Sequence, residues 1–164
     1  GWQEWEALFD DITENEGVHF LGSVICISST SDPLSPRFEI VDGQQRLTTI
    51  SILFAALYKA LNEYKNALDE DQQADVLQLK RKLVLKNADS SLRLVPQIQG
   101  NNREDYLGLL AKVGVLSPRP SPRYAGNRKI EKAYKYFTKR INAMLDDKPE
   151  ASDKIGVLFD ILGT

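Results

Sequence analysis

The chain has 164 residues, of which 42% are hydrophobic and 27% are charged, and its formal net charge is −2. These values are typical of a single globular domain with a sizeable core, and they exclude a chain that is basic over its whole length. The sequence has no run of about 18 apolar residues and no visible secretory signal, so we expect a cytoplasmic protein without a membrane span.

The chain starts at Gly1 instead of Met and stops at Thr164 just after an apolar run. We therefore expect one domain that is a fragment of a longer protein. His19 and Cys26 are the single histidine and the single cysteine. This composition excludes an internal disulfide, a Cys/His zinc cluster and a His-Asn-His nuclease centre. No Walker-type loop and no Gly-x-Gly-x-x-Gly run is present.

The first elements are a helix and two strands. Residues 2–16 show helical periodicity, and we interpret their acidic residues as a solvated face instead of a metal site. Residues 19–27 form an apolar segment typical of a buried strand, with Gly22 and Ser23 in its middle. A loop over 28–37 leads to a second strand at Phe38, and we expect the two strands to pair as a hairpin.

The stretch from Phe38 to Ile50 begins as this strand and continues as a helix. Asp42 and Gln45 have the spacing of a helix cap and its partner. Gly43 allows a ligand close to the backbone, and the first free N–H groups of a helix attract anions. Arg46 adds a planar cation suited to phosphate. The simpler alternative is a capped helix whose polar residues only solvate its first turn.

The rest of the chain is mostly helical in pattern. Helices are predicted at 45–64, 71–85, from 101 onward, at 127–145 and at 154–162, with a short strand at 92–96 and an irregular, proline-rich loop at 114–126. The 127–145 helix has the most basic surface, to which Arg119, Arg123 and Arg140 add charge. Its candidates for DNA-phosphate contacts are Arg128, Lys129, Lys132, Lys135 and Lys139. A solvated helix face is the alternative interpretation.

Two motifs at a characteristic distance resemble a known family. The segments Phe20–Ile25 and Glu39–Thr49, the latter with its Asp-Gly-Gln-Gln-Arg run, resemble the N-terminal domain of GmrS/GmrD-type modification-dependent restriction proteins. This is domain-of-unknown-function family 262, which is related to the ParB/sulfiredoxin fold. Weaker similarity at Ser91–Pro96, Asn102–Tyr106 and Ile130–Phe137 extends the resemblance over nearly the whole chain.

Because strands are few and early and helices dominate afterwards, we expect an α+β fold, in which several helices pack on a small mixed or antiparallel sheet. The resemblance implies that this sheet is ParB/sulfiredoxin-like. Residues 1–100 would form the ParB-like core, and residues 101–164 a helical part. It also implies a nucleoside-triphosphate-binding regulatory domain of a bacterial anti-phage system. That system would recognise modified DNA through the full-length protein, with a His-Asn-His nuclease as a further domain or partner. Whether the chain hydrolyses the nucleotide stays open at this stage.

In this interpretation the residues of the motif have distinct roles. Gly43, Gln44 and Gln45 present N–H groups to phosphate, and Arg46 neutralises its charge. Gln44 or Gln45 orients an attacking water, and Asp42 holds a Mg²⁺-bound water or caps the helix. Further phosphate or pocket contacts are expected from Thr48, Thr49, Gly22 and Ser23. Alternatives are a DNA-binding module, a plain interaction domain, and a clamp whose nucleotide controls self-association.

Overall fold

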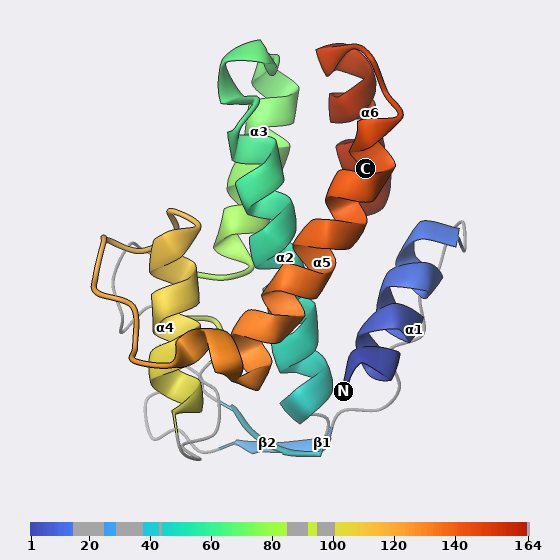
Figure 1. Cartoon of the computed structure of the whole chain (residues 1–164). Helices are drawn as coiled ribbons and strands as arrows, with labels where there is room; N and C mark the ends of the chain where they lie inside the picture. The colour runs from blue at the N-terminus through green and yellow to red at the C-terminus, as the bar shows by residue number, and fades with distance from the viewer. Residues whose placement is uncertain (15–24, 29–37, 43, 85–91, 95–100, 164) are drawn as a thin grey trace.

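The structure is a computed structural model, and it describes residues 1–14, 25–28, 38–42, 44–84, 92–94 and 101–163. Helices dominate this part of the chain (Figure 1). They are α1 (Trp2–Glu14), α2 (Gln44–Asn62), α3 (Glu70–Arg81), α4 (Asn102–Lys112), α5 (Lys129–Asp146) and α6 (Ala151–Leu162). Short 3-10 helices follow α2 and precede α5, namely η1 (Lys65–Ala67) and η3 (Ala125–Asn127). The strands are β1 (Ile25–Ser28) and β2 (Phe38–Asp42).

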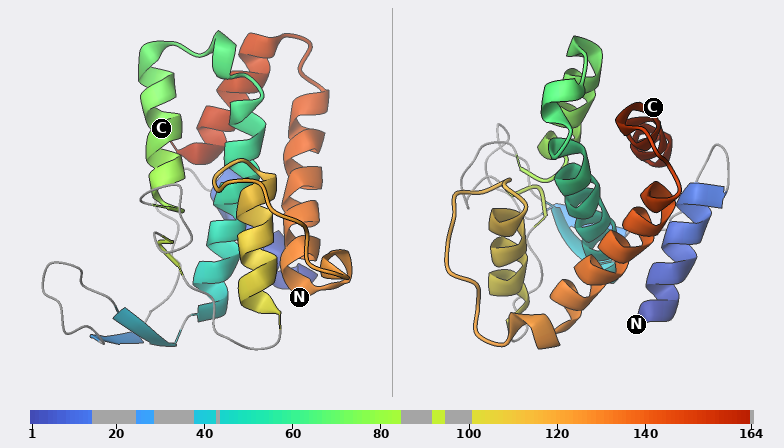
Figure 2. Two further views of the ribbon diagram at one scale, coloured as in Figure 1. Left: turned by 90° about the vertical axis from the view of Figure 1, so that its left-hand side faces the viewer. Right: turned by 45° about the horizontal axis from the view of Figure 1, so that its top comes forward.

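The predicted α+β fold is wrong. The buried apolar side chains of the described residues lie on the helices and on the turns that join them, so helices packed on helices form the core. β1 and β2 pair only with each other, antiparallel, with Cys26 opposite Ile40 and an irregularity between Ile25 and Cys26. Figure 2 shows this two-stranded sheet at one end of the helical assembly, where it does not cover the face of any helix. Two strands of four and five residues are too small to support a core, which explains why the helices pack on one another.

The predicted short strand at 92–96 is described only at residues 92–94. There Leu92 makes an isolated antiparallel bridge with Val84, and the Arg93 N–H donates to the Leu83 carbonyl at 2.9 Å. This contact closes the turn after α3 and adds no sheet among the described residues.

The predicted helices agree better with the structure. Apolar periodicity placed both α2 and α5 within two residues of their observed ends. α3 ends at Arg81, four residues before its predicted end, and α6 begins at Ala151, three residues before its predicted start. The start of α3 is fixed by a capping box, in which the Gln72 N–H donates to the Asp69 carboxylate at 2.8 Å and the Gln72 side chain accepts from the Asp69 N–H at 3.0 Å.

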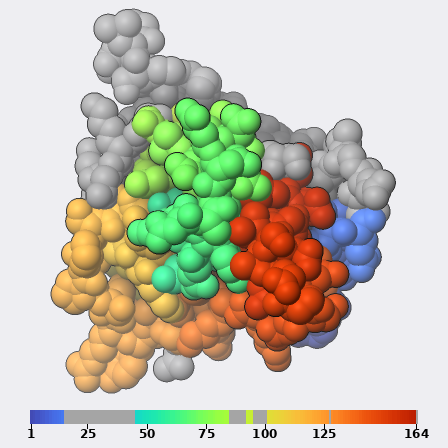
Figure 3. Space-filling model, turned by 90° about the horizontal axis from the view of Figure 1, so that it is seen from above, coloured from blue at the N-terminus to red at the C-terminus, as the bar shows by residue number. Residues whose placement is uncertain are grey.

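α2 is the central helix of the assembly. Its residues from Ile50 to Leu61 are largely buried, because α5, α3 and α6 all pack against it. α3 and α6 approach it near its C-terminal end, and Figure 3 shows the side chains of this end of the molecule. Its N-terminal end lies beside the strands (Figure 1).

α1 packs on α5 through an aromatic and ionic contact. The Phe9 and Phe137 rings stack with centroids 6.3 Å apart, and Arg140 donates to the Asp10 carboxylate at 2.7 Å. The Arg140 guanidinium also lies 4.7 Å from the centre of the Phe9 ring. This contact therefore joins segments 130 residues apart in sequence. No helix in the described ranges is long and apolar enough to span a bilayer.

Tyr106 of α4 places a hydroxyl group in the core. Its side chain is fully buried, and its hydroxyl lies near Ser51 of α2 without a hydrogen bond of good geometry to any described residue. Burial raises the pKa of Tyr106 to about 12, and the Ser51 hydroxyl opposes this shift.

This buried phenol predicts a specific loss of stability in alkali. The folded state keeps the Tyr106 proton up to about pH 12, whereas the unfolded chain releases it near 10.0. The free energy of unfolding therefore falls as pH rises between these two values, by up to about 2.7 kcal/mol from this group. Urea unfolding at a series of pH values should show a smaller alkaline loss in Tyr106→Phe than in the parent chain. An identical loss in both proteins would show that Tyr106 does not titrate as described.

Candidate functional site

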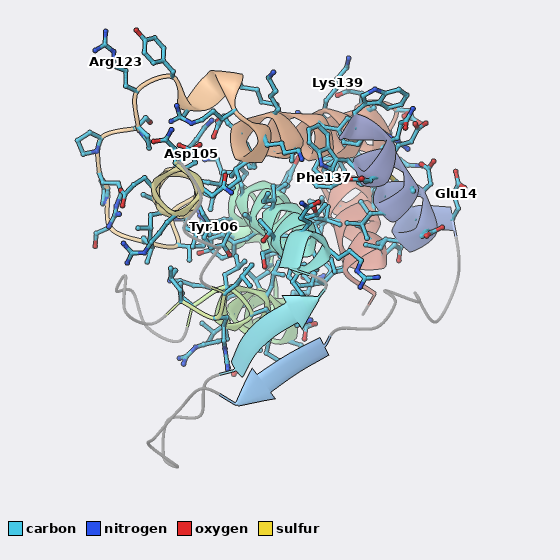
Figure 4. The ribbon with its side chains drawn as sticks, turned by 90° about the horizontal axis from the view of Figure 1, so that it is seen from below. Glu14, Asp105, Tyr106, Arg123, Phe137 and Lys139 are labelled. Atoms are coloured by element: carbon cyan, nitrogen blue, oxygen red, sulfur yellow. The ribbon has the colours of Figure 1, made fainter. Side chains whose placement is uncertain are left out.

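The predicted anion site lies where β2 leads into α2. Asp42 is the last residue of β2 and Gln44 is the first residue of α2, so a single residue separates strand from helix. Figure 4 shows this junction from below, with β2 running into the first turn of α2. The predicted change from strand to helix at this place is therefore confirmed.

The exposure of α2 changes sharply along its first two turns. Gln45 and Arg46 are exposed, and Leu47 and the two threonines after it are half-buried. Ile50 is the first buried residue of the helix. The first turn of α2 therefore exposes polar side chains, whereas the later turns of the same helix are buried in the core.

The threonines differ from the expected phosphate ligands. The Thr49 hydroxyl donates to the Gln45 carbonyl at 2.8 Å, one turn back on the same helix. This bond uses the only hydrogen that Thr49 could donate to a phosphate, as is common for threonine within helices. Thr48 is half-buried, and both it and Arg46 already have interactions within the chain.

Part of the predicted site lies outside the described residues. Gly22, Ser23 and Gly43 belong to this part. Asp42 and Gln44 provide the backbone at the end of β2 and at the start of α2. The described contribution to the site is thus the exposed pair Gln45 and Arg46 at the start of α2.

Arg128, a predicted candidate for DNA-phosphate contact, is held in an ion pair within the fold. Its guanidinium donates to both carboxylate oxygens of Asp105, from Nε at 2.6 Å and from the terminal nitrogen Nη2 at 2.8 Å. The Asp105 side chain is 2% exposed and the Arg128 side chain 27%. Hydrogen bonding to Asp105 raises the pKa of Arg128 further above its ordinary value. A bidentate pair of this kind fixes geometry, and here it ties the first turn of α4 to the N-cap of α5.

The four predicted lysines remain on the surface of α5. Lys129, Lys132, Lys135 and Lys139 are all exposed. The pKa of the Glu4 carboxylate in α1 is lowered mainly by the hydrogen bond from the N-terminal amine, and Lys129 adds a smaller electrostatic contribution. Lys132, Lys135 and Lys139 have no ion-pair partner in the ranges that the structure describes.

An open groove of about 560 Å³ runs along one side of α5. Its lining residues are Lys112, Tyr134, Lys135, Thr138, Lys139, Asn142, Ala143 and Asp146. Lys112 of α4 forms part of the groove wall and contacts two residues of α5. Its ammonium group lies 2.6 Å from the Glu131 carboxylate and 5.0 Å from the centre of the Tyr134 ring. Burial raises the pKa of Tyr134, so this phenol is neutral at ordinary pH.

Two features of this surface were missed by sequence reasoning. The partners Asp105 and Arg128 are 23 residues apart, and no periodic pattern links them. Tyr124 is exposed and has a positive φ of 63°, which its position at the end of a proline-rich loop does not predict. The tripeptide Arg-Tyr-Ala at 123–125 would have signalled only an exposed loop.

Comparison with known proteins identifies the family of the chain but finds no related solved structure. The family described as GmrSD restriction endonuclease, N-terminal domain, matches residues 1–162. This match confirms the family resemblance drawn from the sequence. No curated protein and no solved structure matches the chain.

The Asp105–Arg128 pair yields a prediction about stability. Arg128→Ala leaves the Asp105 carboxylate buried without its partner, so the thermal midpoint should fall by several degrees. Lys132→Ala removes an exposed charge of the same sign and should shift the midpoint by only about one degree.

A double variant separates loss of the pair from loss of packing. Asp105→Leu combined with Arg128→Met removes both charges while it keeps apolar volume, and it should be more stable than Arg128→Ala alone. Equal midpoints for Arg128→Ala and Lys132→Ala would contradict the structural role of this pair.

Proposed function

Because the chain belongs to the family of GmrSD restriction endonuclease N-terminal domains, we propose that it binds a nucleoside triphosphate as the regulatory domain of a modification-dependent restriction system. Membership of a restriction-system family is established by the match over residues 1–162. Nucleotide binding, and hydrolysis after it, is the part that we propose.

The observation that supports this site is the exposed polar first turn of α2. Gln45 and Arg46 are solvent-exposed at the start of a helix whose later turns are buried. The start of a helix carries free N–H donors and the positive end of the helix dipole, which both favour phosphate. A guanidinium and an amide beside these donors match the oxygens of a triphosphate in charge and in hydrogen-bond type.

Each residue has a role within this proposal. Backbone N–H groups of Gly43, Gln44 and Gln45 would hold phosphate oxygens, and Arg46 would neutralise their charge. Gln44 or Gln45 would orient the attacking water if the nucleotide is hydrolysed, and Asp42 would hold Mg²⁺ through water. Thr48 stays a candidate phosphate ligand, whereas the hydrogen bond of Thr49 to Gln45 leaves it a smaller role.

The remaining parts of the restriction system lie beyond this domain in our proposal. With one histidine in the sequence, a His-Asn-His centre has to come from another domain or subunit. Modified DNA would then be recognised and cut by the full-length assembly, and the nucleotide state of this domain would control that step. Self-association of this domain is one way in which such control would be transmitted.

Ligand-induced stabilisation tests the proposal directly. We expect one of the four NTPs, with Mg²⁺, to raise the thermal midpoint of the chain. A ligand at about 100 times its dissociation constant adds roughly 2.7 kcal/mol to the free energy of unfolding. For a chain of this size that corresponds to a shift of roughly 5–10 °C. Differential scanning fluorimetry with each NTP, with and without Mg²⁺, measures it.

Matched arginine variants locate the site. Arg46→Ala should lose the shift, whereas Arg103→Ala should keep it, because Arg103 is an exposed arginine at the start of another helix, α4. Each variant is compared with its own ligand-free midpoint, since Arg46 has interactions within the chain. A shift that survives in Arg46→Ala at full size would refute the assignment of this turn.

A further inference from the structure

Arg123 and Tyr124 form an exposed cation–aromatic pair at the end of the loop before α5. The Tyr124 side chain is 64% exposed, and the Arg123 guanidinium carbon lies 4.9 Å from the centre of its ring. Figure 4 shows Arg123 projecting away from the body of the molecule. No described residue of the core packs on the ring, so neither its size nor its orientation is explained by folding.

The backbone holds this pair in an unusual conformation. Tyr124 has φ 63° and ψ 15°, a left-handed conformation that an aromatic L-residue rarely adopts. The turn around it is closed by hydrogen bonds from the Ala125 N–H to the Pro122 carbonyl at 3.2 Å and from the Arg128 N–H to the Ala125 carbonyl at 3.0 Å.

Both sides of this turn are anchored to α4. The Pro122 ring packs so closely on Gly108 that a Cβ there would lie 2.9 Å from the Pro122 Cδ. On the other side, Arg128 is held by the buried Asp105 carboxylate. The backbone that carries Arg123 and Tyr124 is therefore held in place by α4. A ligand that binds this pair does not have to order the backbone of the turn.

A row of lysines continues from this turn along α5. Lys132, Lys135 and Lys139 are exposed, and their spacing of three and four residues places them on one side of the helix, about 4.5 and 6 Å apart along its axis. The Lys135 ammonium lies 3.5 Å from the position that a Cβ on Gly126 would take, so this lysine of the row lies beside η3. Figure 4 shows Arg123 and Lys139 projecting from the same side of the molecule.

We propose that Arg123, Tyr124, Lys135 and Lys139 form one contact surface for nucleic acid, in which the three cations bind backbone phosphates and the Tyr124 ring stacks on an unpaired base. Cations in a row without carboxylate partners in the described ranges match a polyanion. An exposed ring face next to them matches a base, because single-strand binding combines a basic track with aromatic stacking platforms.

The same features disfavour an acidic protein as the ligand. Carboxylates would pair with the cations and leave the Tyr124 ring exposed. The surface also has a boundary, since Asp146 lies at the far end of the groove that Lys135 and Lys139 line. This carboxylate repels phosphate, so the strand would run from Lys139 toward Tyr124 and not along the rest of α5.

The test measures binding of a fluorescein-labelled single strand and of the matching blunt duplex to the 164-residue chain by fluorescence anisotropy at several salt concentrations. Tyr124→Asn removes the ring and keeps a residue that tolerates positive φ. We expect it to weaken single-strand binding about five-fold or more and duplex binding much less. Tyr124→Phe keeps the ring and should bind the single strand as the parent chain does.

Lysine variants test the phosphate track. Lys135→Gln with Lys139→Gln should lower the slope of log K against log salt by about 1.4 for the single strand. The control is Lys59→Gln with Lys65→Gln, which removes the same charge from exposed positions at the C-terminal end of α2 and in η1. This control should leave the salt slope unchanged. Thermal melting of each variant verifies that it folds.

Three results would overturn the proposal. The first is single-strand binding in Tyr124→Asn equal to that of the parent chain. The second is a salt slope that changes as much in the control as in the α5 double variant. The third is displacement of the strand by poly-glutamate at equal charge concentration, which would identify an acidic polypeptide as the ligand. Strand binding is measured without nucleotide, so this surface is tested independently of the nucleotide site.

Discussion

Burial of α2 on several sides is the constraint on which the rest of the structure depends. From Ile50 onward this helix is enclosed by α5, α3 and α6, so the positions that face a neighbour are apolar with the exception of Ser51. A group of consecutive exposed polar residues fits best at an end of such a helix. The first turn, with Gln45 and Arg46, lies at that end beside the β1–β2 ribbon. The position of the candidate nucleotide site thus follows from how the core is built.

The arginines and lysines around α5 perform different tasks. Arg128 and Arg140 each bind a carboxylate on another helix, Asp105 on α4 and Asp10 on α1, and so fix two of the helices that pack on α5. The planar guanidinium suits such partly buried contacts, whereas the strongly hydrated lysine ammonium stays in water. The exposed lysines are therefore left for an external anion, and the two arginines are not.

Sequence reasoning succeeded where local periodicity decides the outcome and failed where distant segments meet. The apolar stripes of α2 and α5 fixed these helices to within two residues. The sheet was predicted from the few early strands and from the family resemblance, but the described strands are too short to form a layer of the core. The ion pair of Arg128 was not predicted, because its partner Asp105 lies 23 residues away on α4 and leaves no local signal. The positive φ of Tyr124 depends on anchoring at Pro122 and Arg128, which composition does not reveal.

The net charge of −2 would argue against nucleic-acid binding if charge acted as a sum over the chain. It does not, because mobile ions screen exposed charges beyond about 8 Å at physiological ionic strength. In this structure Asp10 of α1 pairs with Arg140, Glu4 of α1 lies near Lys129, and Asp105 is paired inside the fold. The segment from Arg123 to Lys139 therefore presents a local excess of positive charge to a ligand. An acidic chain can offer a basic contact surface when its helices separate the two signs of charge in this way.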